Sequence, residues 1–310
     1  MKKILVLEGG FNEEHEISLN TSKEVQKSLE RMKFKFDVLQ VNPANFSKKI
    51  VFYDDDVVCF NALHGTYGED GTIQKILENN KLTYTHSDSK VSKIAFDKNL
   101  TKTNIKNSEV VFLESIILDK SQITKDQFYK AYSRFSSFVL KPVSSGSSFG
   151  VKIFVSINDI EKFFSNYKNE IKTYNNIKKL MIEKYIKGRE LTVTVFENNG
   201  NSQPIEVTEI ISKNLFFDYK AKYTRGLSQH ILPANLPKKI YHQCLSYAKI
   251  VHDILGCKGI TRSDFIYDEK KIYFLEINTQ PGLTPVSLVP EQLSYKNINF
   301  DLLIKKIIDI

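Results

Sequence analysis

The chain has 310 residues, of which 41% are hydrophobic and 26% charged, a composition typical of a globular protein with two or three domains. It contains no apolar run of the roughly 18 residues that a transmembrane helix needs, so we expect no membrane association. The net charge of +8 is spread along the sequence without a basic run, so we expect no nucleic-acid partner. The apolar stretch after Lys3 is too short for a signal peptide, which predicts a cytoplasmic protein.

Residues 1–95 alternate between apolar strands and a helical pattern. Runs typical of buried parallel strands occur at residues 3–7, 36–41 and 57–63. Apolar side chains recur at helical spacing over residues 18–32. This alternation predicts a doubly wound, Rossmann-like domain, whose ligands gather beyond the carboxyl ends of the strands. Two loops rich in glycine and charge follow the first and third strands, at residues 8–16 and 64–71.

Residues 96–182 predict a separate α+β unit. It is entered by a helical stretch over residues 91–106, and its expected strands lie near residues 110–113, 138–141 and 151–155. A helix is expected near residues 158–174. The loop that follows Lys141 consists mainly of serine and glycine, whose N–H and O–H donors suit a phosphate. A plain flexible linker is the alternative interpretation of this loop.

Residues 183–310 predict a third unit. A strand over residues 180–186 leads into it, and a helix is expected from Pro237 to Gly256. Between them, residues 218–233 are polar and show little periodicity, which is typical of a lid, a binding loop or disorder. The three cysteines, Cys59, Cys244 and Cys257, lack metal or disulfide spacing and are expected in the core.

Two polar-bearing strands over residues 261–278 predict an antiparallel hairpin. Glu276 and Asn278 are two residues apart and therefore share one face. If Asp264 pairs with Glu276, then Arg262 lies opposite Asn278. Facing carboxylates repel each other, and a divalent cation with bound phosphate compensates, so the hairpin predicts a Mg²⁺ site. A solvated sheet face is the alternative.

These features together indicate a nucleotide–Mg²⁺ site between two domains: acidic oxygens on a hairpin, a small-residue loop, a long lid, and lysines at Lys98, Lys141 and Lys222. The sequence has neither a P-loop nor the motifs of a protein kinase, which excludes both classes.

Five collinear motifs then resemble the D-alanine–D-alanine ligases of the ATP-grasp superfamily. They cover nearly the whole chain, at residues 14–18 (EHEIS), 62–71 (ALHGTYGEDG), 141–148, 218–223 (DYKAKY) and 275–290. The resemblance implies a Rossmann-like domain followed by a two-subdomain ATP-grasp fold, with the nucleotide between antiparallel sheets.

The resemblance also implies the reaction. ATP phosphorylates one D-alanine, and the amino group of a second attacks the acyl phosphate, which gives D-alanyl-D-alanine for peptidoglycan precursors. ATP is then a substrate, two Mg²⁺ ions assist with Mn²⁺ as a substitute, and the enzyme is a homodimer.

The roles that the resemblance implies in the amino-acid site are as follows. Glu14 holds the ammonium of the first D-alanine, and a Glu14–Tyr223–Ser147 hydrogen-bond chain fixes the lid. Arg262 and the backbone N–H of Gly282 stabilise the tetrahedral oxyanion. Further substrate contacts come from His64, Ser287 and Leu288, with Ser287 on the carboxylate of the second substrate.

For the nucleotide, the resemblance implies that Lys98, Lys141 and Lys222 hold phosphates. Glu183 binds the adenine amino group and Glu190 the ribose. The metal ligands are Asp264, Glu276 and Asn278. The remaining implied nucleotide contacts are Ser147, Ser148, Lys184, Ile186, Phe274 and Asn278.

Three alternatives remain open. Tyr223 favours an amino group as the second nucleophile, with D-lactate or D-serine as rival second substrates. Gln280 and Pro285 depart from the family pattern, which leaves an ATP-grasp ligase for other carboxylates and amines. The third alternative is a nucleotide-responsive binding protein without turnover. Retention of Arg262 and Glu276 argues against it, because a protein that only binds would not need the metal and oxyanion residues.

Overall fold

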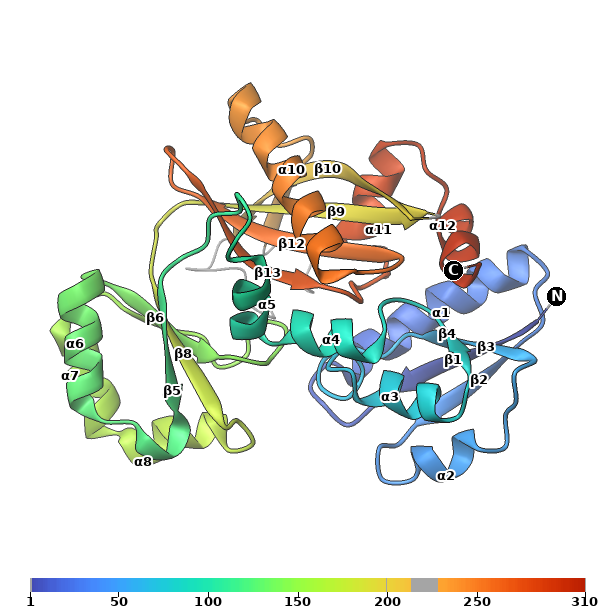
Figure 1. The fold of residues 1–310 in the computed structure, drawn as a ribbon, viewed down its shortest axis with the longest axis horizontal. Helices are drawn as coiled ribbons and strands as arrows, with labels where there is room; N and C mark the ends of the chain where they lie inside the picture. The colour runs from blue at the N-terminus through green and yellow to red at the C-terminus, as the bar shows by residue number, and fades with distance from the viewer. Residues whose placement is uncertain (1, 199, 213–227, 310) are drawn as a thin grey trace.

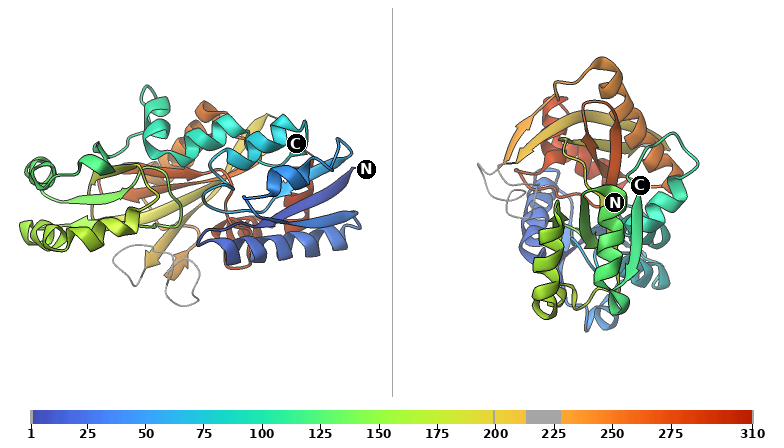
Figure 2. Two further views of the ribbon diagram at one scale, coloured as in Figure 1. Left: turned by 90° about the horizontal axis from the view of Figure 1, so that it is seen from below. Right: turned by 90° about the vertical axis from the view of Figure 1, so that its left-hand side faces the viewer.

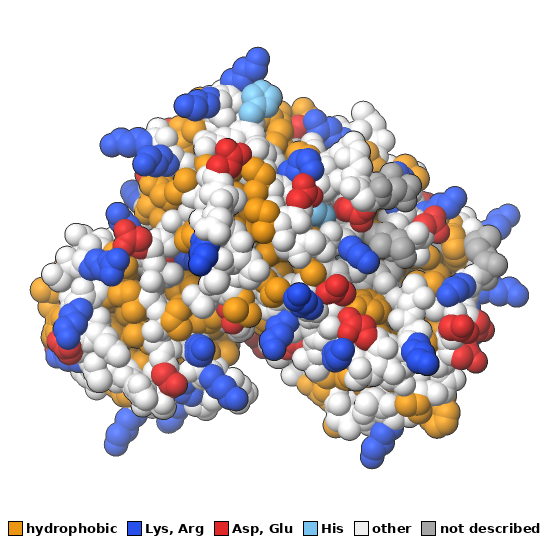
Figure 3. Space-filling model, in the orientation of Figure 1, with side chains coloured by type: hydrophobic (Ala, Val, Ile, Leu, Met, Phe, Trp, Pro, Cys, Tyr) orange, Lys and Arg blue, Asp and Glu red, His pale blue; other side chains and the backbone are white. Residues whose placement is uncertain are grey.

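The computed structural model describes residues 2–198, 200–212 and 228–309, which fold around three sheets. In Figure 1 the N-terminal sheet (blue) and the central sheet (green) lie at opposite ends of the molecule, and the C-terminal sheet (yellow to red) lies between them. Among the described residues, no helix is long and apolar enough to cross a membrane. Lysine and arginine side chains are scattered over the face shown in Figure 3.

The N-terminal sheet is parallel, in the order β2-β1-β3-β4, with strands at Phe36–Val41, Lys3–Gly9, Val57–Asn61 and Thr83–Tyr84. Alternate residues of β1 face opposite sides. Ile4 and Val6 pack with helices α1 (His15–Arg31) and α12 (Phe300–Ile308), whereas Leu5 and Leu7 pack with α2 (Phe46–Ile50) and α3 (Thr72–Asn79). Figure 2 shows helices on both faces of this sheet. The predicted doubly wound domain is therefore confirmed.

The central sheet is antiparallel, in the order β5-β8-β6-β7, with strands at Ser115–Asp119, Lys179–Lys184, Phe138–Pro142 and Lys152–Phe154. A 3-10 turn at Lys120–Gln122 leads to α6 (Lys125–Phe135), which with α7 (Ile157–Ser165) packs on one face through an aromatic core around Phe128. The single helix predicted over 158–174 is wrong, because the chain breaks at Asn166 into α7, α8 (Tyr167–Glu170) and a 3-10 turn.

The C-terminal sheet is also antiparallel, in the order β11-β10-β9-β12-β13. Its strands are Ser228–Ile231, Asn201–Ser212, Arg189–Asn198, Ile260–Tyr267 and Ile272–Asn278. Helix α10 (Lys238–Leu255) packs on this sheet and ends at Gly256, whose φ of 72° suits glycine. Helix α11 (Leu288–Tyr295) contacts β9 and β10. The predicted hairpin register is confirmed, with Asp264 opposite Glu276 and Arg262 opposite Asn278.

The segment between the first two units differs from the prediction. It forms α4 (Ser89–Phe96) and α5 (Lys98–Ile105), whose apolar residues pack into the core of the C-terminal sheet. The strand expected at residues 110–113 is wrong: Phe112 makes only an isolated bridge to Phe274, and β5 begins later. The hydrophobic packing therefore does not follow the predicted domain boundary between residues 95 and 96. The predicted boundary between residues 182 and 183 falls inside strand β8.

The predicted irregular stretch at residues 218–233 is partly wrong. Ser228–Ile231 is strand β11, which pairs with β10 at the edge of the C-terminal sheet. Residues 218–227, including Lys222 and Tyr223, lie outside the described residues. The cysteines are buried, as expected.

Candidate functional site

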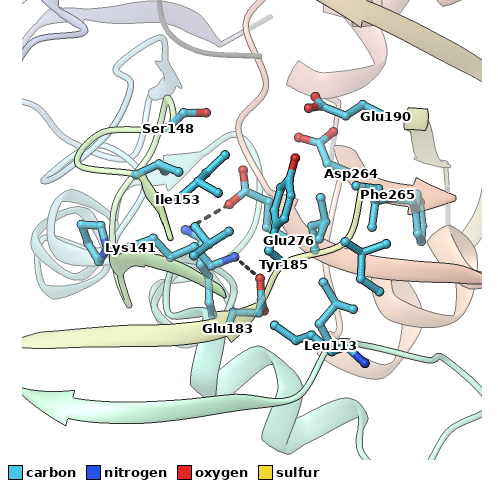
Figure 4. A pocket seen from close by; sticks show the side chains of 18 of the residues that line it. Leu113, Lys141, Ser148, Ile153, Glu183, Tyr185, Glu190, Asp264, Phe265 and Glu276 are labelled. Atoms are coloured by element: carbon cyan, nitrogen blue, oxygen red, sulfur yellow. Dashed lines mark hydrogen bonds and ion pairs between the residues drawn. The ribbon is translucent and has the colours of Figure 1, made fainter. Parts of the chain in front are cut away.

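Two pockets lie where the three sheets meet, and they share Lys98, Ser145 and Glu276. The first, here called the large pocket, opens between the central and C-terminal sheets (Figure 4). The second, called the small pocket, lies between the N-terminal domain, the serine-rich loop and β13. A ligand that filled the large pocket would therefore reach the small pocket past Lys98 and Glu276.

The large pocket has apolar walls contributed by both sheets. Val139 and Ile153 lie on paired strands of the central sheet, and Phe265 and Leu275 face them from the hairpin. Tyr185 and Ile186 belong to the segment that connects the two sheets and also line the pocket, as do Lys184 and Glu190. An apolar slot with a few polar groups at its edge suits a flat heterocycle.

A buried cluster of charges forms one wall of the large pocket. Glu183 on β8 is 2% exposed, and its Oε2 lies 2.5 Å from the Nζ of Lys141 on the neighbouring strand β6. Its Oε1 is hydrogen-bonded to Lys102 of α5. Burial raises the pKa of Glu183, but the charges of Lys141 and Lys102 outweigh it and hold the pKa below the ordinary range. Glu183 is therefore a carboxylate that accepts hydrogen bonds from both lysines.

Lys98 lies at the junction of the two pockets. The sequence placed it on a helix, and the structure shows it at the first turn of α5 with the side chain almost wholly buried. Its Nζ donates to the backbone carbonyl of Ser145, at 2.9 Å, and lies 3.0 Å from Oε2 of Glu276. A buried ammonium at this position is suited to an anion that spans both pockets.

The facing carboxylates of the hairpin are each compensated by a cation. Arg262 donates from Nε and Nη2 to the two oxygens of Asp264, both at 2.9 Å, and Thr192 adds a hydrogen bond of 2.6 Å. Glu276 is paired with Lys98. The sequence argument expected a metal to relieve this repulsion, whereas the protein's own cations already do so.

The donor set nevertheless fits a hard divalent cation. Asp264 and Glu276 both line the large pocket, and Asn278 lines the small pocket on the same strand face as Glu276. Carboxylate and amide oxygens are the ligands that Mg²⁺ prefers. Within the described ranges, no three acidic, histidine or cysteine side chains gather into a metal cluster, so the set consists of two carboxylates and one amide.

The small pocket is built around Glu14, which is 6% exposed. Ser147, from the loop after β6, donates a hydrogen bond to Oε1 of Glu14. A Cβ on Gly146 would lie 2.9 Å from Oε2 of Glu14, so a larger residue here would displace the carboxylate. The predicted chain joins Glu14 to Ser147 through Tyr223, whereas the structure shows a direct hydrogen bond between Ser147 and Glu14. Tyr223 lies outside the described residues.

The two serines of the loop belong to different pockets. Ser147 and Ser148 both adopt the left-handed region, with φ of 49° and 57°. Ser147 lines the small pocket and Ser148 the large one. Such consecutive left-handed residues are uncommon for serine, and they cluster at sites where a loop holds a ligand.

His64, Glu69, Arg262 and Gly282 also line the small pocket. His64 is hydrogen-bonded through Nε2 to Thr21, at 2.9 Å, and through Nδ1 to Glu69, at 3.2 Å. Ser287 occupies the N-cap position of α11, although its side chain makes no capping hydrogen bond. It lies beside Gly282, since a Cβ on that glycine would lie 2.9 Å from Ser287 Oγ. This arrangement places backbone and side-chain donors together at the small pocket.

Some predicted residues lie elsewhere. Phe274 is fully buried in the core beneath the hairpin and does not line the large pocket, so its predicted nucleotide contact is not supported; its neighbour Leu275 faces the pocket instead. Leu288 is buried at the start of α11. Sequence reasoning missed Lys102, Glu69 and Tyr185. Lys102 lies one helical turn after Lys98, and this spacing is the signal that could have revealed it.

Gln280 has a structural role. It is 2% exposed, its Oε1 accepts from Asn61 at 2.8 Å, and its Nε2 donates to the carbonyl of Leu63. It therefore joins the C-terminal unit to the end of β3. Pro285 is exposed. Neither arrangement supports the altered substrate site that these unusual residues suggested.

Known proteins with similar sequences and structures include D-alanine–D-alanine ligases. The family model described as the D-ala D-ala ligase C-terminus matches residues 103–309. The chain is 40% identical to the D-alanine–D-alanine ligase of Zymomonas mobilis, covering 99% of this chain and 93% of that protein. It is 40% identical to that of Pelagibacter ubique, covering 99% and 97%. It also superposes on the Bacillus anthracis D-alanine–D-alanine ligase complexed with ATP, with a TM-score of 0.80, 26% identity and coverage of 100% and 97%. The chain belongs to the D-alanine–D-alanine ligase family and has the ATP-grasp fold that its motifs predicted.

Proposed function

We propose that this chain is an ATP- and Mg²⁺-dependent ligase that joins two D-alanine molecules through a D-alanyl phosphate, and so supplies D-alanyl-D-alanine for peptidoglycan precursors. The observation that carries the proposal is the junction of the two pockets at Lys98, Ser145 and Glu276. A nucleotide in the large pocket places its terminal phosphate beside an amino acid in the small one. Catalysis then rests on positioning and charge neutralisation.

In the large pocket, the apolar slot receives the adenine, and the groups around it orient the nucleotide. Glu183 accepts from the adenine amino group, with Lys184 and Ile186 on the connecting segment beside it. Glu190 binds the ribose. Ser148, Lys141 and Lys98 neutralise phosphate charge. Asp264, Glu276 and Asn278 hold Mg²⁺, which adds positive charge at the transferring phosphate.

In the small pocket, Glu14 binds the ammonium of the first D-alanine, because a buried carboxylate requires a cation. The guanidinium of Arg262 and the N–H of Gly282 stabilise the oxyanion that forms when the second amino group attacks. Ser287 receives the carboxylate of the second D-alanine, and His64 completes the wall of the pocket.

Water must be kept from the acyl phosphate, which otherwise hydrolyses. The hydrogen bond from Ser147 to Glu14 joins the serine-rich loop to the N-terminal domain over the small pocket, which supports a covering role for this loop. The resemblance assigns Lys222 and Tyr223 to the same cover, with Lys222 on phosphate and Tyr223 between Glu14 and Ser147 in the hydrogen-bond chain.

D-Alanine is the proposed second substrate, with D-serine and D-lactate as the rivals that a change in the lid would favour. The proposal further includes a homodimer, as in the family, and a cytoplasmic location, where ATP is available. Sedimentation of the purified protein tests the first of these, and fractionation of cells tests the second.

The reaction is tested by offering the protein ATP, Mg²⁺ and D-alanine, alone or with L-alanine, D-serine or D-lactate, and by identifying the products by mass spectrometry. We expect D-alanyl-D-alanine and ADP with D-alanine alone, and little mixed product. Nucleotide binding without any D-alanine-dependent product would instead indicate a binding protein without turnover.

A further inference from the structure

Lys102 is a buried lysine next to the large pocket that does not line it. It lies on α5 one turn after Lys98 and is 5% exposed. Its Nζ donates to Glu183, to the carbonyl of Leu113 at 3.0 Å and to Ser115 at 3.3 Å. All three ammonium protons therefore have acceptors within the protein, and the side chain is fixed in position.

The charges of this cluster do not cancel. Lys102 and Lys141 both contact Glu183, one on each carboxylate oxygen, so two positive charges face one negative charge. Of the two lysines, only Lys141 lines the pocket. Without Lys102, Lys141 would be the one lysine left on Glu183, and both carboxylate oxygens would attract its ammonium and hold it away from an anion in the pocket.

We infer that Lys102 is a positioning residue for the nucleotide: it holds one oxygen of Glu183, so that the carboxylate does not draw the ammonium of Lys141 away from the phosphates. The inference rests on the proposed function only in placing a nucleotide in the large pocket. Lys102 acts through Glu183 and Lys141 and does not touch the ligand.

A purely structural role for Lys102 makes a different prediction from this one. If Lys102 only packs the central unit, removing it weakens nucleotide binding whether or not Glu183 is charged. If it acts by holding the Glu183 carboxylate, its removal matters mainly while Glu183 is an anion that can draw Lys141 toward itself. A double-mutant cycle separates the two roles, because Glu183→Gln removes the charge and keeps an oxygen that accepts hydrogen bonds.

The experiment is isothermal titration of ADP with Mg²⁺ into the wild type, Lys102→Met, Glu183→Gln and the double variant. We expect Lys102→Met alone to raise the Kd about tenfold, and to change it by less than about threefold when Glu183 is already Gln. Lys152→Met is the matched control. Lys152 also pairs with a glutamate of the central unit, Glu170, but neither residue lines either pocket, so its loss should leave the Kd unchanged.

An equal loss of affinity in both backgrounds, or none in either, would overturn the inference. If circular dichroism shows that Lys102→Met does not fold, the Kd values of Glu183→Gln and the double variant are compared instead. A loss of affinity above about threefold between these two variants contradicts an action through the Glu183 carboxylate. A wild type that binds no ADP would instead contradict the proposed function, so the two failures are distinguishable.

Discussion

The ammonium of Lys98 lies 3.0 Å from the carboxylate of Glu276, and these two side chains line both pockets. They come from different elements, α5 and β13. In the proposed function, this pair marks the point at which a phosphate passes from the nucleotide to the amino acid.

Replacing Lys98 with Gln should lower kcat/KM for ATP about 100-fold, because a preorganised buried cation is lost where charge develops. The rate of ADP formation at saturating D-alanine measures this. Lys90→Gln, on the exposed side of α4, is the control and should leave the rate unchanged. Equal rates for wild type and Lys98→Gln would show that Lys98 does not act on the phosphate.

Replacing Glu14 with Gln should raise the KM for D-alanine about ten- to hundredfold, since a hydrogen bond to a charged group contributes about 1.5–3 kcal/mol. The affinity for ATP should change little, because Glu14 lines only the small pocket. Steady-state kinetics with each substrate varied in turn separates the two effects. Glu16→Gln, at an exposed neighbouring position, is the control. A matching rise in the KM for ATP would contradict the assignment of Glu14 to the amino acid.

The sequence predicts local features of the structure better than features that depend on long-range contacts. Strand alternation alone placed Glu276 and Asn278 on one face, and the register considered for the hairpin, with Asp264 opposite Glu276, is the one that the structure shows. The burial of Lys98 did not follow from local patterns, because it depends on contacts with Ser145 and Glu276, far away in the chain. The same holds for Glu183, whose lysine partners come from a helix and another strand.

Some element boundaries and packing partners also could not be predicted from local sequence patterns. Residues 110–113 are apolar enough for a strand, but they pack along β13 and form only one bridge there. From the sequence alone, helices α4 and α5 could be assigned to either neighbouring unit. The packing of their apolar side chains against the C-terminal sheet assigns them to that sheet. Periodicity identifies an amphipathic face without identifying what covers it.

His252 should make folding sensitive to acid. Burial lowers its pKa to about 4, and its Nδ1 is hydrogen-bonded to Thr261 at 2.8 Å. Between pH 6.5 and about 4 the unfolded chain binds a proton that the folded protein does not, so stability falls as the pH falls. The stability advantage of the wild type over His252→Gln should shrink by up to about 1.4 kcal/mol per pH unit in this window. Urea unfolding of both proteins at pH 7 and pH 5 measures it, and an advantage independent of pH would contradict the buried neutral histidine.

Gln280→Ala should destabilise the protein by about 2 kcal/mol, because Asn61 and the carbonyl of Leu63 each lose a buried hydrogen-bond partner. The Tm of the variant should fall, whereas the KM values should change little. In a double-mutant cycle, Asn61→Ala and Gln280→Ala should be less than additive. Additive effects would show that the two side chains do not stabilise each other.

The central claim, transfer of phosphate to a carboxylate at the junction of the pockets, is tested most directly with D-alanine labelled with ¹⁸O in its carboxylate. An acyl phosphate requires that one labelled oxygen appear in the inorganic phosphate at each turnover. We expect this transfer in the wild type and its loss, with that of activity, in Glu276→Gln. Dipeptide formation with no label in the phosphate would contradict the account.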